Sequence, residues 1–334
     1  MATPENKKIG WGLLSTAAIN RAILAAMPNS PRGAIVAVGS RDQARAEAYA
    51  AERNIPRAHG SYEALLADPE VQVVYISLPN SLHAEWTIKA LEAGKHVLCE
   101  KPFALTLADV DAMFAAAQAN HRVLAEAFMY RHHPRIIKAR ELVQSGAIGE
   151  PRVLHATFSF SLDKEVNVRW DPALGGGALW DAGCYTVSLA RYLFGAPDRV
   201  AGWQRLVKSG VDGTFAGALH FPNGSVAMID CSFQAPFRAW AEVAGSTGVL
   251  RLDRPYHADQ PAASLTLRTK ESDEEQTFEV PNPERYLLEI EDMHSATLDG
   301  TAPLISPAET RGVIETILDL YASAAQQKEV PGRI

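Results

Sequence analysis

The sequence predicts an α/β protein in which a doubly wound parallel sheet is followed by an α+β domain with a large, mostly antiparallel, open-faced sheet. In the first part of the chain, solidly apolar strands alternate with helical segments, which is typical of a parallel sheet covered by helices. After Tyr130 the strands alternate apolar and polar residues, as in an antiparallel sheet with one covered face. A chain of 334 residues is long enough for two domains.

Short apolar runs define the expected parallel strands. They span residues 8–14, 34–39, 71–78, 97–100 and 123–127. Each run leads into a turn and a helical segment. We expect one helix to open within residues 15–20, and others at about 42–52, 83–93 and 106–119. Thr106 and Asp109 have the spacing of a capping box, which marks the start of the last of these helices.

The second part of the chain is expected to be an antiparallel sheet with a few helices. In residues 153–161, Leu154, Ala156 and Phe158 fall on one face of a strand, opposite His155. Pro222-Asn223-Gly224 joins two further strands and is a strong hairpin signal. We place the domain boundary near residue 126, which gives domains of residues 1–126 and 127–334.

Composition excludes several classes of protein. A net charge of −7 provides no basic field for nucleic acid, and no apolar run is long enough to span a membrane. The N-terminus lacks the apolar region of a signal peptide, so we expect a cytoplasmic protein. The three cysteines lack metal-ligand spacing and are expected to be reduced, and we expect no metal.

The turn after the first strand is the first candidate site. A strand, a turn of small residues and a helix together bind a pyrophosphate on backbone N–H groups. Gly10 and Gly12 lie too early for this turn and are expected within the strand. The turn contains instead small or polar residues where glycines are usual, and we expect it to contact a dinucleotide: Ser15, Thr16, Ala17, Ala18 and Ile19.

The end of the second strand indicates which dinucleotide is bound. An acidic residue here typically binds the ribose hydroxyls of NAD, whereas an arginine suits the 2′-phosphate of NADP. Ser40 and Arg41 occupy this place, followed by Asp42, which is alternatively the cap of the next helix. We therefore expect NADP as the cofactor, with NAD as the alternative.

Two further strand ends carry polar groups at the same predicted edge. Leu78 and Asn80 end one strand, and His83 begins the helix that follows; His83 is alternatively a packing or capping residue. The run Val97 to Pro102 ends in Glu100 and Lys101, so the lysine lies at a strand tip, where ligands bind in open α/β sheets. A lysine held in a cleft can donate hydrogen bonds or exchange a proton.

The second part of the chain contributes a second cluster. Three glycines at 175–177 precede a helix in which Asp181 and Tyr185 are four residues apart, so they are expected on one face. Gly183 between them suggests a close approach to the backbone. A carboxylate, a phenol and a lysine can together hold a polyol and move its proton. Arg169 and Trp170 are expected to wall this pocket and contact the cofactor.

Glu100-Lys101-Pro102 together with Gly-Gly-Gly-Ala-Leu-x-Asp-x-Gly-x-Tyr at 175–185 resembles the Gfo/Idh/MocA oxidoreductases. Residues 127–134 point to the subgroup of NADP-dependent D-xylose (aldose) 1-dehydrogenases and trans-1,2-dihydrobenzene-1,2-diol dehydrogenases. The resemblance implies a dinucleotide-binding Rossmann domain, a second domain for substrate binding and oligomerisation, and a catalytic group of Lys101, Asp181 and Tyr185. It also implies a cis peptide at Lys101–Pro102 and a homodimer or homotetramer formed through the C-terminal sheet.

The resemblance favours an NADP-dependent oxidoreductase that acts on a cyclic sugar, with an aldopyranose oxidised at C1 as the first hypothesis. Tyr185 replaces the histidine of inositol-dehydrogenase-like members, and either Tyr185 or Lys101 is the proton acceptor. Alternatives within the family are a trans-dihydrodiol dehydrogenase and a sugar ketoreductase. Alternatives outside this chemistry are a non-catalytic NADP-sensing regulator and a glycosidase that uses a bound nucleotide for transient oxidation.

Overall fold

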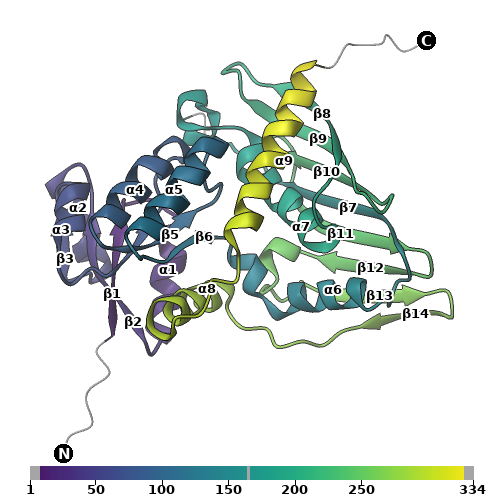
Figure 1. The fold of residues 1–334 in the computed structure, drawn as a ribbon, viewed down its shortest axis with the longest axis horizontal. Coiled ribbons are helices and arrows are strands. Elements are labelled where there is room, and N and C mark those ends of the chain that lie inside the picture. The colour runs from purple at the N-terminus through teal and green to yellow at the C-terminus, as the bar shows by residue number, and fades with distance from the viewer. Residues whose placement is uncertain (1–7, 164–165, 327–334) are drawn as a thin grey trace, which may run out of the picture. The chain divides into compact units, whose positions relative to one another are not determined.

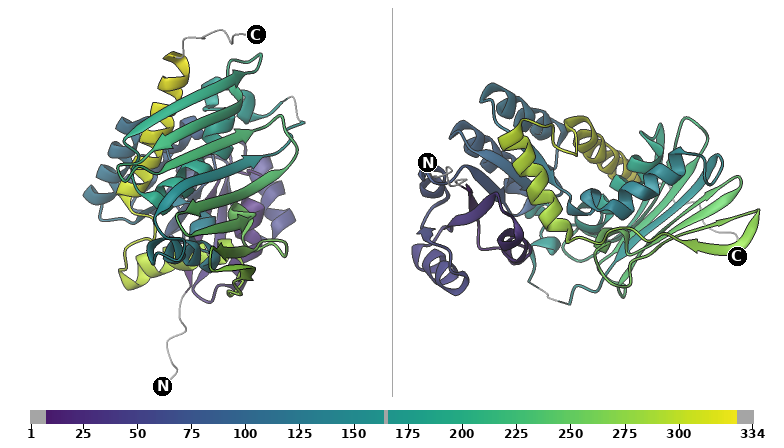
Figure 2. Two further views of the ribbon diagram at one scale, coloured as in Figure 1. Left: turned by 90° about the vertical axis from the view of Figure 1, so that its right-hand side faces the viewer. Right: turned by 90° about the horizontal axis from the view of Figure 1, so that it is seen from below.

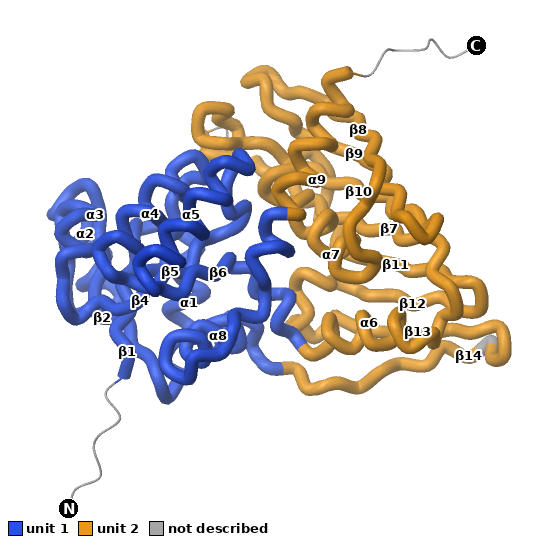
Figure 3. Tube along the Cα trace, in the orientation of Figure 1, with its two compact units in different colours: residues 1–133, 283–311 blue, residues 134–282, 312–334 orange. Residues whose placement is uncertain are grey.

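The chain forms two compact units, which are coloured in Figure 3. The structure, a computed structural model, describes residues 8–163 and 166–326. Unit 1 comprises residues 1–133 and 283–311, and unit 2 comprises residues 134–282 and 312–334. This division differs from a single boundary at residue 126, because residues 283–311 return to the N-terminal unit. Sequence periodicity cannot reveal such a return, since it depends on which surface that segment buries.

Unit 1 contains a six-stranded parallel sheet with the strand order β3-β2-β1-β4-β5-β6. The order reverses direction at β1 and β4, which is the doubly wound arrangement that the sequence predicts. The strands are β1 (Ile9–Leu14), β2 (Gly33–Gly39), β3 (Arg57–His59), β4 (Val73–Ile76), β5 (His96–Glu100) and β6 (Leu124–Ala127). β3 is too short and too polar to have been identified as a strand from its sequence.

Helices connect these strands, and their starts follow local capping rules. They are α1 (Asn20–Ala26), α2 (Gln43–Arg53), α3 (Tyr62–Ala67), α4 (His83–Glu92) and α5 (Leu107–Ala119) (Figure 1). The Asp42 side chain accepts a hydrogen bond from the Arg45 backbone N–H at 2.7 Å, so Asp42 caps α2. The Thr106 side chain accepts from the Asp109 N–H at 3.0 Å, which confirms the predicted start of α5.

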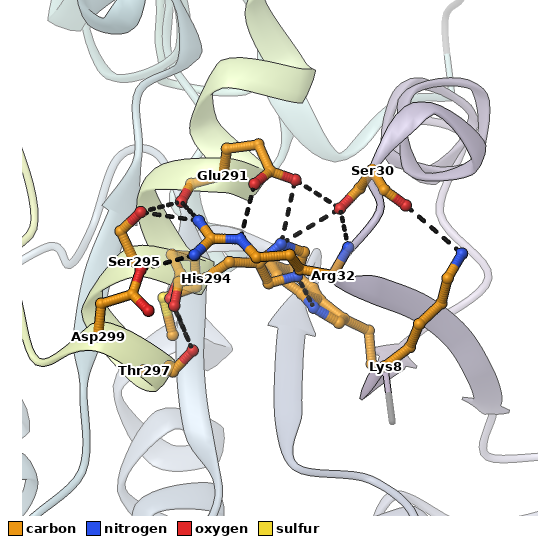
Figure 4. Close-up of polar contacts among 10 residues, drawn as sticks. Lys8, Ser30, Arg32, Glu291, His294, Ser295, Thr297 and Asp299 are labelled. Carbon is orange, nitrogen blue, oxygen red and sulfur yellow. Dashed lines mark hydrogen bonds and ion pairs between the residues drawn. The ribbon is translucent and has the colours of Figure 1, made fainter. Parts of the chain in front are cut away.

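The returning helix α8 (Arg285–His294) is attached to the start of the parallel sheet by a partly buried polar network (Figure 4). Arg32 donates to Glu291 at 3.0 Å and to Ser295 at 2.8 Å. The indole of Trp11 in β1 donates to Nε2 of His294 at 2.9 Å, and both side chains are fully buried. The Trp11 bond makes Nε2 of His294 an acceptor, so the ring proton is on Nδ1.

Unit 2 is built on an eight-stranded sheet with the order β14-β13-β12-β11-β7-β10-β9-β8. β7 and β10 are parallel and the other pairs are antiparallel, which confirms the expected mostly antiparallel sheet. The strands are β7 (Pro151–Ser159), β8 (Arg199–Leu206), β9 (Asp212–His220), β10 (Val226–Ser232), β11 (Arg238–Gly245), β12 (Gly248–Asp253), β13 (Leu265–Thr269) and β14 (Ser272–Thr277). The predicted hairpin at 222–224 joins β9 to β10.

One face of this sheet is covered by helices, whereas the other is open, as the left view of Figure 2 shows. The helices are α6 (Pro134–Gln144), α7 (Cys184–Phe194) and α9 (Pro307–Gln326), of which α9 has its first turn in unit 1. Leu154, Ala156 and Phe158 of β7 are buried as predicted, and His155 is exposed. Within the described residues, no helix combines the length and apolarity needed to cross a membrane.

The Trp11–His294 hydrogen bond predicts a pH-dependent stability. Burial lowers the pKa of His294, against the opposing effect of its hydrogen bond to Glu291. Because the folded pKa lies below the unfolded one, stability should fall as pH drops below about 6.5. Trp11→Phe leaves the buried Nε2 without its donor and should cost about 1–3 kcal/mol at neutral pH.

Chemical denaturation of the wild type and of the Trp11→Phe variant between pH 5 and 8 measures the free energy of unfolding and its dependence on pH. Trp86→Phe is the matched control, because Trp86 is also buried in unit 1, at 8% exposed, and packs edge-on against Tyr62. Equal stability of the Trp11→Phe and Trp86→Phe variants at pH 7 would show that the buried bond contributes nothing.

Candidate functional site

The predicted cofactor residues of unit 1 follow four neighbouring strands at their carboxyl ends. β2, β1, β4 and β5 are consecutive in the sheet and all parallel, so the turns that follow them lie along one edge. Ser15–Ile19, Ser40–Arg41, Leu78–Asn80 and Glu100–Lys101 are therefore neighbouring segments. This edge, at the reversal of strand order, is where open α/β sheets bind their ligands.

Side chains hold the turn after β1 in place of the usual glycines. Ser15 has φ 136°, a conformation that normally favours glycine. Its hydroxyl lies 2.8 Å from the Ser77 hydroxyl and accepts from the Ala17 N–H at 3.1 Å. Asn20 donates to the Ser15 carbonyl at 2.8 Å and accepts from Ser77 at 2.6 Å. These bonds fix the conformation of the turn, and its contact with a pyrophosphate remains a prediction.

Gly10 and Gly12 lie inside β1, as the sequence predicts. A Cβ at Gly10 would lie 2.0 Å from the Glu70 carbonyl, and one at Gly12 would lie 2.8 Å from Val71. Close packing against the segment that precedes β4 therefore accounts for both glycines.

A second arginine accompanies Arg41 at the end of β2. Ser40 is buried and Arg41 is exposed. Arg45, one helical turn further along α2, donates from Nε to the Thr16 hydroxyl at 2.9 Å. This bond brings a guanidinium to the turn after β1, and the donor set of two guanidiniums and nearby hydroxyls fits the 2′-phosphate of NADP. The signal in the sequence that could have indicated Arg45 is its position four residues after Arg41.

His83 differs from its expected role as a cofactor contact. It is fully buried, and its two ring nitrogens lie 2.9 Å from the carbonyl oxygens of Leu78 and Pro102. Burial lowers the pKa of His83, although these two carbonyls oppose the shift. Because both ring nitrogens face backbone carbonyls, the geometry favours the packing role of His83 over a contact with the cofactor. Leu78 is also buried, whereas Asn80 is half-buried in the turn that follows.

Lys101 is half-buried at the tip of β5, and the Lys101–Pro102 peptide is cis, as the family resemblance implies. The preceding residue, Glu100, was also expected at the cofactor. Its Oε2 accepts from the Lys101 N–H at 3.2 Å, and its Oε1 accepts from the Tyr75 hydroxyl at 2.5 Å. Both carboxylate oxygens therefore bind the protein, so Glu100 supports Lys101, and Tyr75 is a residue that the sequence reasoning missed.

In unit 2, Asp181 and Tyr185 occupy successive helical segments. Leu179–Gly183 is a π-helical turn that continues into α7, where the spacing predicts an uninterrupted α-helix. Such turns are frequent at functional sites. Arg169 donates from Nε to Asp181 at 2.6 Å, so these two predicted residues meet. A Cβ at Gly183 would lie 2.9 Å from the Cys231 thiol, so a core side chain makes the expected close approach.

Aromatic rings surround the Tyr185 side chain, which is 5% exposed. Phe158 contacts it edge-on with centroids 5.4 Å apart, and Tyr256 lies 5.3 Å away. Trp170 packs edge-on against Phe233 at 5.3 Å. Tyr185 is therefore a buried phenol packed against aromatic rings, on the helix that continues from the segment carrying Asp181.

A buried carboxyl group, which the sequence reasoning also missed, holds the start of this helical segment. Asp212 accepts from the Leu179 N–H at 2.8 Å and from the Tyr321 hydroxyl at 2.7 Å. Burial raises the pKa of Asp212 to about 6, although both hydrogen bonds lower it. Gly177 has φ 131°, and a Cβ there would lie 2.3 Å from the Asp212 carboxylate. The glycine loop is thus closely packed against Asp212.

The predicted residues fall into two groups. Unit 1 carries the dinucleotide edge with Lys101, whereas unit 2 carries Arg169, Trp170, Asp181 and Tyr185. Each group is assembled within its own unit, and the convergence of Lys101 with Tyr185 remains a prediction.

A parallel-sheet edge suited to a dinucleotide in unit 1, and the polar residues Arg169, Asp181 and Tyr185 in unit 2, are the arrangement expected of a dinucleotide-dependent oxidoreductase. The chain matches a family model described as an oxidoreductase family with an NAD-binding Rossmann fold over residues 9–128. It also matches the GFO/IDH/MocA C-terminal domain over residues 136–251. The chain belongs to the Gfo/Idh/MocA family of NAD(P)-dependent oxidoreductases.

Relatives with assigned activities support this membership. A D-xylose 1-dehydrogenase (NADP⁺) of Haloferax volcanii is 39% identical over 94% of this chain and 97% of the relative. A trans-1,2-dihydrobenzene-1,2-diol dehydrogenase of Mus musculus is 36% identical over 73% of this chain and 74% of the relative. A 3-ketoreductase from Actinomadura kijaniata, solved with NADP and TDP-benzene, has a TM-score of 0.88 at 27% identity, covering 95% of this chain and 98% of that one.

The Gly177–Asp212 contact leads to a prediction about the helix that carries Asp181. Gly177→Ala combines a left-handed backbone, which costs about 1–2 kcal/mol, with a collision against Asp212. It should lower the thermal midpoint and the NADP-linked turnover together, because the start of the π-helical turn must move.

Gly224→Ala is the matched control, since Gly224 has φ 81° but no atom within 4 Å of the added Cβ. It should show the backbone cost alone and retain turnover. If the two variants have the same melting curve and turnover, Asp212 does not hold the helix start.

Proposed function

We propose that this protein is an NADP-dependent dehydrogenase that oxidises an aldopyranose, such as D-xylose or D-glucose, at C1 to the lactone. The observation that supports this most directly is the Arg169–Asp181 ion pair on the helical segment that continues into Tyr185, a donor and acceptor set suited to a polyol. The activity of the Haloferax volcanii relative supports the same substrate class. When bound, the nicotinamide of NADP accepts the hydride from the carbon that bears the reacting hydroxyl.

The side chains of this chain have distinct roles in the proposal. In one form of the proposal Tyr185 takes the hydroxyl proton, while the Lys101 ammonium holds the reacting oxygen and favours the phenolate. In the other form Lys101 is neutral and takes the proton itself. Asp181, oriented by Arg169, accepts a hydrogen bond from the neighbouring hydroxyl and so orients the ring. Ser15–Ile19 hold the pyrophosphate, and Trp170 walls the pocket.

A trans-dihydrodiol is the second candidate substrate, and one observation favours it. Phe158 and Tyr256 flank Tyr185, and such rings bind an unsaturated carbocycle as well as the apolar face of a sugar. Turnover at the NADPH absorbance band with aldoses, trans-dihydrodiols and keto-sugars distinguishes the candidates. NADPH binding without turnover across this panel would instead favour a regulator.

We further propose a homo-oligomer formed through the open face of the unit 2 sheet. Trp203, Met228 and Trp240 are 54%, 44% and 37% exposed there, an unusual concentration of large apolar side chains. Light scattering should give a dimer or tetramer mass, and Trp203→Glu with Trp240→Glu should reduce it to the monomer. A monomeric wild-type protein would refute this proposal.

The acid/base assignment predicts large kinetic effects. Tyr185→Phe and Lys101→Met should each lower kcat by about 10²–10⁴-fold, because proton transfer from the hydroxyl loses its partner. The dissociation constant of NADPH, measured by fluorescence titration, should change little. Tyr192→Phe, on the same helix as Tyr185, should retain turnover. Wild-type turnover in both catalytic variants would contradict the proposal.

The cofactor assignment predicts a change in preference. Arg41→Asp and Arg45→Ala should each weaken NADPH binding by about 10- to 100-fold, since a hydrogen bond to a charged group is worth about 1.5–3 kcal/mol. NADH binding should be unaffected. Arg53→Ala, in the last turn of α2, is the control and should change neither affinity. An unchanged ratio of NADPH to NADH affinity in both variants would remove the arginines from the cofactor site.

A further inference from the structure

The support of Lys101 begins at a buried side chain on the neighbouring strand. Tyr75 lies in β4 and is fully buried, and its hydroxyl donates to Oε1 of Glu100 at 2.5 Å. The other oxygen of Glu100 accepts from the backbone N–H of Lys101 at 3.2 Å. Two hydrogen bonds therefore connect the core of the sheet with the backbone of the lysine.

The register of the sheet accounts for this arrangement. Tyr75 pairs with Leu98 across the β4–β5 ladder, and Glu100 follows Leu98 by two residues. Side chains two residues apart on a strand share a face, so Tyr75 and Glu100 lie on one face as diagonal neighbours. The reach of a tyrosine side chain spans such a diagonal.

The charge environment makes the tyrosine donor important. Burial raises the pKa of Glu289 in α8 well above its usual value, and the nearby Glu100 charge adds to this shift. Glu126 in β6 is also buried. Burial, followed by the nearby Glu100 charge, raises the pKa of Glu126 to about 7. Glu100 therefore lies among buried carboxyl groups from two other elements, and hydrogen-bond donors stabilise its carboxylate there.

The Tyr75 hydroxyl is suited to this task. Burial, followed by the Glu100 charge, raises the pKa of Tyr75 well above its usual value. The phenol therefore stays protonated and donates throughout the neutral range. A phenylalanine at this position would fill the same space without the donor.

From this geometry we infer that Tyr75 is a positioning residue for Lys101, acting through the Glu100 carboxylate. The inference rests on the proposed role of Lys101 in turnover. Tyr75 fixes Glu100, and Glu100 fixes the backbone from which the lysine side chain extends. Small displacements of a reacting group reduce rates strongly, so this chain of bonds should affect kcat more than binding.

Tyr75→Phe tests the inference in the full-length enzyme. We expect kcat to fall about tenfold, the equivalent of one hydrogen bond to a charged group, while the NADPH dissociation constant changes less than twofold. Glu100→Gln should also lower kcat. In a double-mutant cycle the two substitutions should be less than additive, because they break one connection.

Thr310→Val is the matched control. The Thr310 hydroxyl donates to the buried Glu126 carboxylate at 2.8 Å, so this variant also removes a buried hydroxyl–carboxylate bond from unit 1. It should lower the thermal midpoint comparably and leave kcat within about twofold, since a merely structural cost acts on stability.

Two results would overturn the inference: kcat in Tyr75→Phe equal to that in Thr310→Val, or strictly additive effects of Tyr75→Phe and Glu100→Gln. Failure of the proposed function is recognised separately. If Lys101→Met retains wild-type turnover, the lysine has no role to be positioned for, whatever Tyr75→Phe shows.

Discussion

The parallel register of β2, β1, β4 and β5 is the constraint on which the dinucleotide edge depends. In a parallel sheet every strand delivers its following turn to the same side, so four segments distant in sequence become neighbours. The backbone ladders set the spacing of these turns, and side chains then refine each one. His83 illustrates this second level, because its ring lies between the carbonyls of Leu78 and Pro102 and so links two adjacent strand ends.

Buried polar networks replace glycine flexibility at this edge. The Ser77 hydroxyl lies 2.8 Å from the Ser15 hydroxyl and donates to Asn20 at 2.6 Å, and Asn20 donates to the Ser15 carbonyl at 2.8 Å. These bonds hold Ser15 in a backbone region that glycine usually occupies. A strained backbone conformation of this kind is retained only when the surrounding structure stabilises it strongly. Here the buried hydrogen bonds provide that stabilisation, so the turn is kept although its glycines are absent.

Unit 2 follows the same principle with a carboxylate. Asp212 binds the first N–H of the π-helical turn and the hydroxyl of Tyr321, and the glycine loop packs directly on it. The Arg169–Asp181 pair and the enclosed Tyr185 are carried by the segment that begins there. In both units, therefore, the segments that carry the groups proposed for chemistry begin at polar groups fixed in the core.

The sequence by itself determined the fold class, five of the six parallel strands, and the segments proposed to carry chemistry. These depend on local periodicity, turn residues and motif spacing, as at β5 with Glu100-Lys101-Pro102 and at the hairpin of 222–224. The tertiary structure alone decided that α8 returns to the first unit through His294 and Arg32. It also decided that His83 and Glu100 bind the protein itself and that Tyr75, Arg45 and Asp212 support the site. The physical reason is that a side chain's role depends on which donors and acceptors face it, and those partners lie far away in sequence.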